Sequence, residues 1–289
     1  MTLKCGTRKS PTRSTIFSSY QRSSRRKNAI KSIEVKVLNT GAVKEAEKHT
    51  VFAARLTQRG HEIHSMDDLL MLYKKAYTEN TLERIVSLPH PTVQKFAVIT
   101  VAVVGASRRF LSQITRHQNE VKFMSASLQY SNYDGNAEFV IPYEILTASQ
   151  DVQEMYMKSC QSDMDSYSKL VQSDIDNDAA GYATPQGLRN ILIISATPYQ
   201  WKHMIGQRVC RRNTAETRIV MLKIWQELYE LSPILFTPEQ TGPFCQRDYC
   251  KEGKMSCEKP IYKLLTPSHI LRLDYPALFT EGDNENKAD

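Results

Sequence analysis

The chain has 289 residues, 41% of them hydrophobic and 24% charged, a globular composition that can bury a sizeable core. The net charge of +7 belongs to one end, because residues 1–32 hold nine Lys or Arg and no Asp or Glu, while the remainder holds 29 basic against 31 acidic residues. This distribution argues against a basic nucleic-acid-binding fold. It predicts a disordered basic tail over residues 1–32, which could still bind nucleic acid without specificity.

The sequence gives no sign of a membrane-spanning helix. The longest strongly apolar run, from Phe96 to Ala106, is interrupted by Thr100 and falls far short of the roughly 20 residues that cross a bilayer. The basic tail lacks the apolar stretch of a secretory signal, although its acid-free composition would also suit an organellar transit peptide. We therefore expect a soluble, cytoplasmic protein whose six cysteines are reduced thiols.

Helices and strands can be predicted in chain order from apolar periodicity, helix caps and breaking residues. The ordered fold is expected to begin near Ile33, where apolar and polar residues alternate. The predicted elements are a strand at 33–38, helices at 42–58, 65–78 and 82–87, a strand at 93–104, a helix at 107–117, a strand at 137–141, and helices at 150–175, 185–192, 198–211 and 214–231. Strands concentrate early and helices late, so the predicted class is α+β.

Basic side chains gather on the predicted helix at 107–117. Arg116 and His117 stand at its end, with Gln113 one turn before them, beside a polar loop with few acids. Guanidinium groups grip phosphates bidentately, so this end of the helix is a candidate anion site. The alternative is a solvated helix face. The following segment, 125–131, is rich in hydroxyl groups that could also hold a phosphate, although serine-rich loops are common.

A second polar group lies on the predicted helices at 198–211 and 214–231. It contains His203, Arg208 and Glu216 within a segment whose apolar residues indicate partial burial. A buried guanidinium must be paired, so a salt bridge between Glu216 and an arginine is the structural alternative to a functional role. For His203, the corresponding alternative is a core histidine with satisfied hydrogen bonds.

Three cysteines, Cys245, Cys250 and Cys257, fall within thirteen residues. A zinc site usually needs four ligands at tighter pair spacing, and His269 could supply the fourth. Nothing in the sequence requires a metal there, and a loop with thiols is the favoured interpretation. We therefore predict no metal site.

These segments together resemble the signature of flavin-dependent thymidylate synthases. The signature's first part is matched by Arg116-His117-Gln118 and then Ser127-Leu128-Gln129-Tyr130-Ser131, with Gln113 three residues before it. Its later part is matched by His203 to Arg208 and then Glu216, and its arginine on a preceding helix by Arg189. The resemblance covers residues 33–235, which implies a catalytic domain there and a C-terminal extension with the cysteine cluster over 236–289.

The chain also departs from the family pattern. Gln118 and Gln129 stand where the family has arginines, and the gap from Arg116 to Ser127 is one residue longer than usual. Thr197 and Tyr199 replace an Asn and an Arg. Two positive charges near anionic ligands are thus lost, and Arg108, Arg109 and Lys122 are the candidates to replace them.

The resemblance implies a fold with a central mixed or antiparallel sheet and flanking helices, assembled as a homotetramer with sites at subunit junctions. It implies FAD as cofactor, NADPH and methylenetetrahydrofolate as co-substrates, and reductive methylation of dUMP to dTMP. The two Arg-to-Gln departures keep open a relative that methylates or hydroxymethylates another pyrimidine nucleotide, such as UMP. A basic nucleic-acid-binding protein is the less favoured alternative.

The resemblance also implies a role for each matching residue. Arg208 would be catalytic, hydrogen-bonding the uracil carbonyl and stabilising negative charge on the ring. The residues implied for nucleotide binding are Gln113, Arg116, Ser127, Gln129, Arg189 and Arg208. Those implied for FAD binding are His90, Arg116, His117, Gln118, Thr197, Tyr199 and His203. The family's chemistry requires no nucleophilic cysteine.

Overall fold

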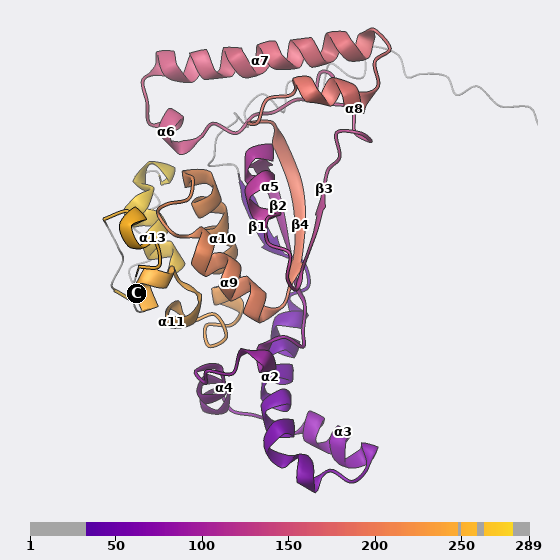
Figure 1. The fold of residues 1–289 in the computed structure, drawn as a ribbon, viewed down its shortest axis with the longest axis vertical. Helices are drawn as coiled ribbons and strands as arrows, with labels where there is room; N and C mark the ends of the chain where they lie inside the picture. Colours follow the sequence, from indigo (N-terminus) through magenta and orange to yellow (C-terminus); the bar gives the residue numbers. More distant parts are fainter. Residues whose placement is uncertain (1–32, 248–249, 259–262, 280–289) are drawn as a thin grey trace, which may run out of the picture.

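A four-stranded antiparallel sheet lies at the centre of the structure, a computed structural model that describes residues 33–247, 250–258 and 263–279 (Figure 1). The predicted basic tail, residues 1–32, lies outside the described residues. The strand order is β1-β2-β4-β3, and every neighbouring pair is antiparallel. The strands are β1 (Glu34–Val37), β2 (Ile99–Ser107), β3 (Val121–Ser125) and β4 (Arg189–Ala196). This architecture confirms the predicted α+β class.

Helices cover one face of the sheet. Alternate residues of β2 and β4 point to this side, and Val101, Val103 and Ile194 are fully buried there. Three helices pack against them, α5 (Arg108–Ile114), α9 (Pro198–Arg208) and α10 (Ala215–Leu231). Trp201 holds α9 against the sheet, because the indole Nε1 donates to the Ile99 carbonyl oxygen of β2 at 3.0 Å.

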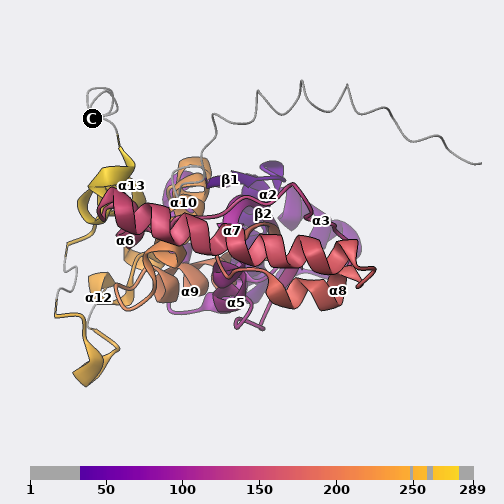
Figure 2. The ribbon, with the colours of Figure 1, turned by 90° about the horizontal axis from the view of Figure 1, so that it is seen from above.

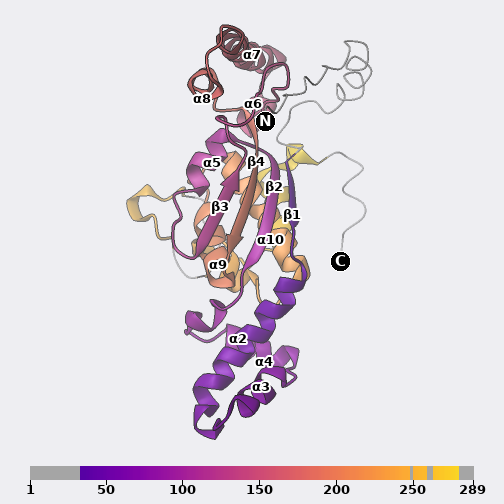
Figure 3. The ribbon, with the colours of Figure 1, turned by 90° about the vertical axis from the view of Figure 1, so that its right-hand side faces the viewer.

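The opposite face of the sheet carries apolar side chains in the open. Figure 3 shows this face turned to the viewer, with no described helix in front of it. Met124 is 71% exposed, Ile191 50% and Ile193 37%. An antiparallel sheet with one solvated face would normally carry polar residues there, so this face is unusually apolar for a solvated one.

Two groups of helices extend from the ends of the sheet. At one end lie α2 (Gly41–Arg59), α3 (Met66–Lys74), α4 (Glu79–Val86) and the short 3-10 helix η3 (Pro91–Gln94). At the other end lie α6 (Tyr143–Leu146), α7 (Gln150–Gln172), α8 (Asn177–Ala180) and the 3-10 helix η4 (Gly181–Ala183). Figure 2 shows α7 lying across this end.

The helices around α7 have a hydrophobic core of their own. It is built from Phe139, Cys160, Met164, Tyr167, Ala180 and Leu188, apart from the main core under the sheet. Tyr156 on α7 donates to the Val140 carbonyl oxygen at 2.7 Å. A side chain at position 187 would collide with the Tyr156 hydroxyl, so Gly187 is what lets α7 approach the chain before β4.

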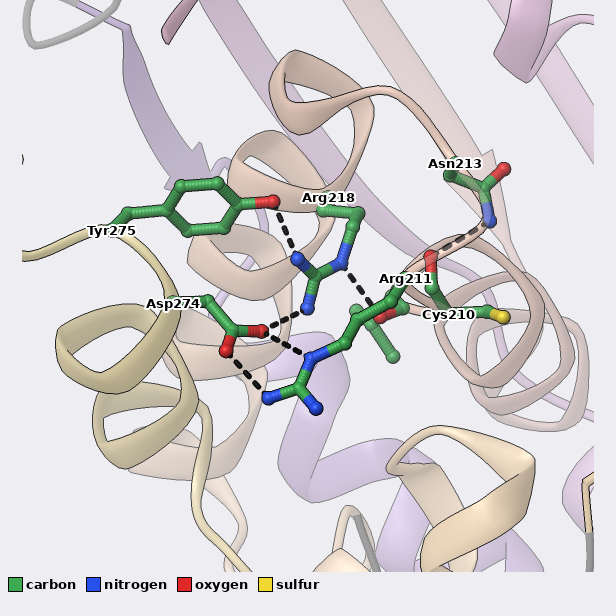
Figure 4. Close-up of polar contacts among 7 residues, drawn as sticks. Cys210, Arg211, Asn213, Arg218, Asp274 and Tyr275 are labelled. Atoms are coloured by element: carbon green, nitrogen blue, oxygen red, sulfur yellow. Dashed lines mark hydrogen bonds and ion pairs between the residues drawn. The ribbon is translucent and has the colours of Figure 1, made fainter. Parts of the chain in front are cut away.

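The chain after residue 235 returns to the main core. It forms α11 (Pro238–Thr241), α12 (Phe244–Arg247), the 3-10 helix η5 (Gly253–Met255), α13 (Pro267–Asp274) and η6 (Pro276–Leu278). Ile270 and Leu271 of α13 are buried in the main core, against α10. Asp274 at the end of α13 pairs with two arginines (Figure 4). Arg211 lies in the turn between α9 and α10, and Arg218 lies in the first turn of α10.

Some predicted elements are wrong. Residues 189–196 form strand β4, not a helix over 185–192, because they alternate between buried and exposed positions and are rich in Ile and Leu. Pro185 opens a turn, in which the Leu188 N–H donates to the Pro185 carbonyl oxygen at 3.0 Å. β2 begins at Ile99 rather than at 93, and the strand predicted at 137–141 is a single bridge between Phe139 and Leu188.

No helix in the described ranges is both long and apolar enough to cross a bilayer. Strand β3 was not predicted, because it has only five residues, Val121–Ser125, and two of them, Lys122 and Ser125, are polar.

Candidate active site

An arginine and a histidine that are 91 residues apart in the chain meet where α5 and α9 end. The Arg208 Nε donates to the His117 Nε2 at 2.9 Å, and the Arg208 Nη1 donates to the Asn213 Oδ1 at 3.4 Å. The His203 ring stands edge-on to the His117 ring, with centroids 6.0 Å apart. We call Arg116, His117, His203, Arg208 and Asn213 the Arg208 cluster. The structure thus brings together four residues that the sequence proposed for the site, and adds Asn213.

Local sequence fixes the cluster in place. Thr197 caps α9, accepting from the Gln200 N–H at 3.3 Å, and Pro198 occupies the first helical turn. The buried Trp201, Met204 and Ile205 hold one side of α9 against the sheet. Asn213 is held by the turn after α9, since its Nδ2 donates to the carbonyl oxygens of Gln207 and Cys210 at 2.9 and 3.2 Å. Arg208 therefore projects from a helix end that is anchored on both sides.

The Arg208 cluster contains two guanidinium groups and no carboxylate. Burial, with the nearby Arg208 and His203, lowers the pKa of His117 to about 4, so its imidazole is neutral near pH 7. The neutral ring accepts at Nε2, which places its proton on Nδ1. Burial and the charge of Arg116 lower the pKa of Arg208, which nevertheless stays protonated. His117 and Asn213, which accept from Arg208, are both neutral, so they do not cancel its positive charge.

The buried neutral histidine predicts a pH dependence of stability. In the unfolded chain His117 binds a proton near pH 6.5, but in the folded chain only near pH 4. Its contribution to stability is therefore present above 6.5 and is lost as the pH falls toward 4. We expect this residue to remove about 2 kcal/mol of unfolding free energy between pH 7 and pH 5.

Urea unfolding of the purified protein at both pH values measures this effect. The His117→Gln variant keeps a neutral acceptor that does not titrate, and it should lose correspondingly less stability between pH 7 and pH 5. Equal losses in the two proteins would show that His117 is not held neutral in the folded state.

A second candidate region is a hollow of about 530 Å³ beside the end of β3. We call it the serine hollow. Ser125, Ser127 and Gln129 line one side, and the loop from Gly181 to Gln186 lines the other. The loop after β3 is held to β4, because the Ala126 N–H donates to the Ile191 carbonyl oxygen at 3.1 Å. Ser127 and Gln129, which the resemblance assigns to nucleotide binding, thus share one hollow.

Arg189 lies in a neighbouring hollow of about 210 Å³ that shares Ala126 with the serine hollow. It is the first residue of β4, so its expected placement on a helix is wrong. Its guanidinium forms an ion pair with Glu138. Its Nε is buried without a hydrogen-bond partner.

Helix α5 connects the two regions. Arg108 at its start lines the serine hollow, and Gln113, Arg116 and His117 lie at or just beyond its end. A rise of 1.5 Å per helical residue puts the two ends roughly 10–15 Å apart. One rigid element therefore sets the spacing between the hollow and the Arg208 cluster.

Other residues assigned to flavin binding lie elsewhere in the chain. His90 is exposed at the start of η3, and Gln118 is exposed after α5. Thr197 donates to the Glu120 Oε2 at 2.9 Å, and the Lys95 ammonium lies 4.6 Å from the centre of the Tyr199 ring. Thr197 and Tyr199 lie close together, because Glu120 and Lys95, their partners, form an ion pair with N–O distance 2.7 Å.

The suggested salt bridge between Glu216 and an arginine is wrong. Glu216 accepts from the Ser107 N–H at 2.6 Å and from the Ser107 hydroxyl at 2.5 Å. Burial raises the pKa of Glu216, and these two bonds oppose the rise. Glu216 thus fixes the junction between β2 and α5, a long-range contact that no local sequence signal reveals. Within the described ranges, no three His, Cys, Asp or Glu side chains are placed to hold a metal ion.

Comparisons with known proteins point to one family. A model of the family described as thymidylate synthase complementing protein matches residues 38–234. The flavin-dependent thymidylate synthase of Thermococcus onnurineus is 29% identical over 184 residues, covering 61% of this chain and 74% of the relative. That of Geobacter sulfurreducens is 26% identical over 179 residues, covering 62% and 75%.

A solved structure shares the fold. The UMP/dUMP methylase PolB from Streptomyces cacaoi, bound with 5-Br dUMP, superposes with a TM-score of 0.58 at 16% identity, covering 72% of this chain and 95% of that one. By class, the protein is an enzyme, a flavin-dependent methyltransferase. It belongs to the thymidylate synthase complementing protein family, the flavin-dependent thymidylate synthases.

Proposed function

We propose that this enzyme is a thymidylate synthase that converts dUMP to dTMP, with methylenetetrahydrofolate as the one-carbon donor and NADPH as the reductant of bound FAD. The observation that carries the proposal is the Arg208 cluster, in which a half-buried guanidinium is held by the neutral groups of His117 and Asn213. Family membership and the names of the matched relatives support the reaction class.

Arg208 stabilises the charge that the reaction creates. For C5 of the uracil ring to act as a nucleophile, enolate-like negative charge must build on the ring and its oxygens, and a fixed guanidinium would stabilise that charge by donating hydrogen bonds to them. His117 orients this guanidinium and stays neutral, so it does not repel it. Asn213 holds the other side from the turn after α9. The cluster is thus preorganised before the substrate binds.

The nucleotide and flavin sites would each be completed by residues of other subunits. Ser127 and Gln129 would hold the nucleotide phosphate in the serine hollow, with Arg189 in the adjoining hollow, while Gln113 and Arg116 would reach it from a neighbouring copy. The separation of these residues within one chain and the uncovered apolar face of the sheet support a homotetramer with shared sites. A cytoplasmic location fits the reduced thiols predicted from the sequence.

The basic and hydrogen-bonding side chains that the family resemblance assigns to the cofactor suit a flavin dinucleotide. His90, Arg116, His117, Gln118, Thr197, Tyr199 and His203 would hold FAD. Its phosphates need cations and N–H donors, which Arg116 and the exposed His203 can supply. When bound, FAD supplies the hydride chemistry, and the chain's own residues bind, orient and stabilise charge.

A second candidate substrate is UMP, because the similar solved structure is that of a UMP/dUMP methylase. Purified holoenzyme given NADPH and methylenetetrahydrofolate should convert dUMP to dTMP faster than it methylates UMP. Mass spectrometry of the nucleotide product decides between them. A yellow, FAD-loaded protein that methylates UMP but not dUMP would reassign the substrate, and one that alters neither would overturn the proposal.

A further inference from the structure

Arg108 carries a charge that the described structure does not neutralise. Its Nη1 is buried without a hydrogen-bond partner. Among the described residues, it takes part in none of the ion pairs. A guanidinium nitrogen that is removed from water without a partner costs free energy, so a site that keeps one is poised for an anionic ligand.

The backbone holds Arg108 firmly at the edge of the serine hollow. The Arg108 N–H donates to the Leu188 carbonyl oxygen at 3.0 Å, and the next N–H, of Arg109, donates to the Gln186 carbonyl oxygen at 3.0 Å. The preceding residue, Ser107, is bound to the buried Glu216. The start of α5 therefore cannot drift away from the hollow.

The chemistry of the hollow suits a phosphate ester. The polar residues around Arg108 are neutral donors and acceptors, namely Ser125, Ser127, Gln129, Thr184 and Gln186. The volume of about 530 Å³ lies in the range of small-molecule sites. The planar guanidinium of an arginine can donate two parallel N–H bonds to a phosphate, a geometry that no other side chain matches as well. Asp178 is the acidic residue of the described lining, and it is exposed on α8.

The other arginine near this region is already engaged. Arg189 is paired with Glu138 in the neighbouring hollow. Gln129 is neutral, so it contributes hydrogen bonds but no charge. Within the lining of the serine hollow, Arg108 is the described cation.

We infer that Arg108 supplies the positive charge that pairs with the phosphate monoester of the pyrimidine nucleotide, beside Ser127 and Gln129, an inference that rests on the proposed function. The experiment uses the FAD-loaded holoenzyme, with dUMP, deoxyuridine and inorganic phosphate as probes. For Arg108→Gln we expect the Kd of dUMP, measured by calorimetry, to rise about 10- to 100-fold, the loss of one charge-assisted contact. The affinity for deoxyuridine, which lacks the phosphate, should change by no more than about twofold.

Arg109→Gln is the matched control, because Arg109 is the next residue on α5 and is exposed. It should leave the Kd of dUMP within about twofold of the wild type. Inorganic phosphate should compete with dUMP in the wild type and in Arg109→Gln, and much more weakly in Arg108→Gln. If Arg108→Gln does not fold, Arg108→Lys keeps the charge without the fork and should still raise the Kd of dUMP by about tenfold.

The outcomes separate this inference from the proposed function. An Arg108→Gln enzyme that binds dUMP as the wild type does overturns the inference alone, since wild-type turnover would stand. Equal losses of affinity for dUMP and deoxyuridine would also overturn it, because they indicate a structural role. A wild-type holoenzyme that binds neither dUMP nor UMP overturns both.

Discussion

Arg208→Lys should lower the turnover of dUMP by about 10²–10³, the usual loss when one fixed donor to a developing oxyanion is removed. Lysine keeps the positive charge but not the planar fork. In the structure two nitrogens of that fork are engaged, since the Nε donates to His117 and the Nη1 to Asn213. A lysine cannot contact both and still face the substrate. Steady-state kinetics with the FAD-loaded enzyme measure the loss.

The matched control is Arg212→Lys, because Arg212 is an exposed arginine in the adjacent turn. It should retain nearly full turnover. The melting temperature of Arg208→Lys should stay close to that of the wild type, because Arg208 is only half-buried and its described partners are neutral. Near-normal turnover together with a sharply lower melting temperature would make Arg208 a structural residue instead.

Asp274→Ala should destabilise the protein by about 3–5 kcal/mol, the cost of leaving a buried charge without its partner. Arg218 is 5% exposed. Its guanidinium pairs with Asp274 and also donates to the Tyr275 hydroxyl at 2.6 Å and to the Val209 carbonyl oxygen at 3.0 Å (Figure 4). Arg211 donates to the same carboxylate at 2.6 Å. Removing the carboxylate leaves two arginines repelling each other.

The pH dependence of this network has a definite sign. Burial alone would raise the pKa of Asp274, but the hydrogen bonds from Arg211 and Arg218 outweigh it and lower the pKa. The stabilisation is therefore present above the ordinary pKa of an aspartate and is lost as the pH falls through the lowered value. Denaturant unfolding of Asp274→Ala near neutral pH should thus show the full effect.

Glu62→Ala provides the comparison. Glu62 makes the same kind of pair with Arg59, but both side chains are more than 40% exposed. Water screens that pair, so its loss should lower the stability very little. If Asp274→Ala costs no more than Glu62→Ala, the network around Asp274 contributes no special stability.

The network also fixes the turn that carries Asn213, so Asp274→Ala should reduce turnover as well as stability.

The helices could be predicted from local signals because their ends are marked. Ser65 and Thr214 cap their helices as expected, accepting from the Asp68 and Thr217 N–H groups. The strands could not be predicted as well. β3 is short and partly polar, and Pro185 before β4 has the same local appearance as a proline that opens a helix. What decides these segments is pairing with a distant strand.

The site shows the same limit. Arg116, His117 and Arg208 were assigned through a resemblance, while residue spacing alone could not place His117 against Arg208 from 91 positions away. The pairing of Glu216 with Ser107 was missed for this reason, since the partners lie 109 residues apart. From the sequence, Arg108 is only one of three basic residues that could replace the two lost arginine charges. Its burial at the edge of the serine hollow distinguishes it from the exposed Arg109 and Lys122.

The separate core under α7 implies that the molecule opens in two cooperative units. Leu188, the residue before β4, belongs to this core. Leu192, four residues further along the chain, belongs to the core under the sheet. Amide protons of α7 should exchange with solvent independently of those in β2 and β4. The serine hollow has one wall on each unit, Ser125 on the sheet side and Gly181 on the α7 side. A nucleotide seated there would bridge the two units and slow exchange throughout α7, far beyond the residues it touches.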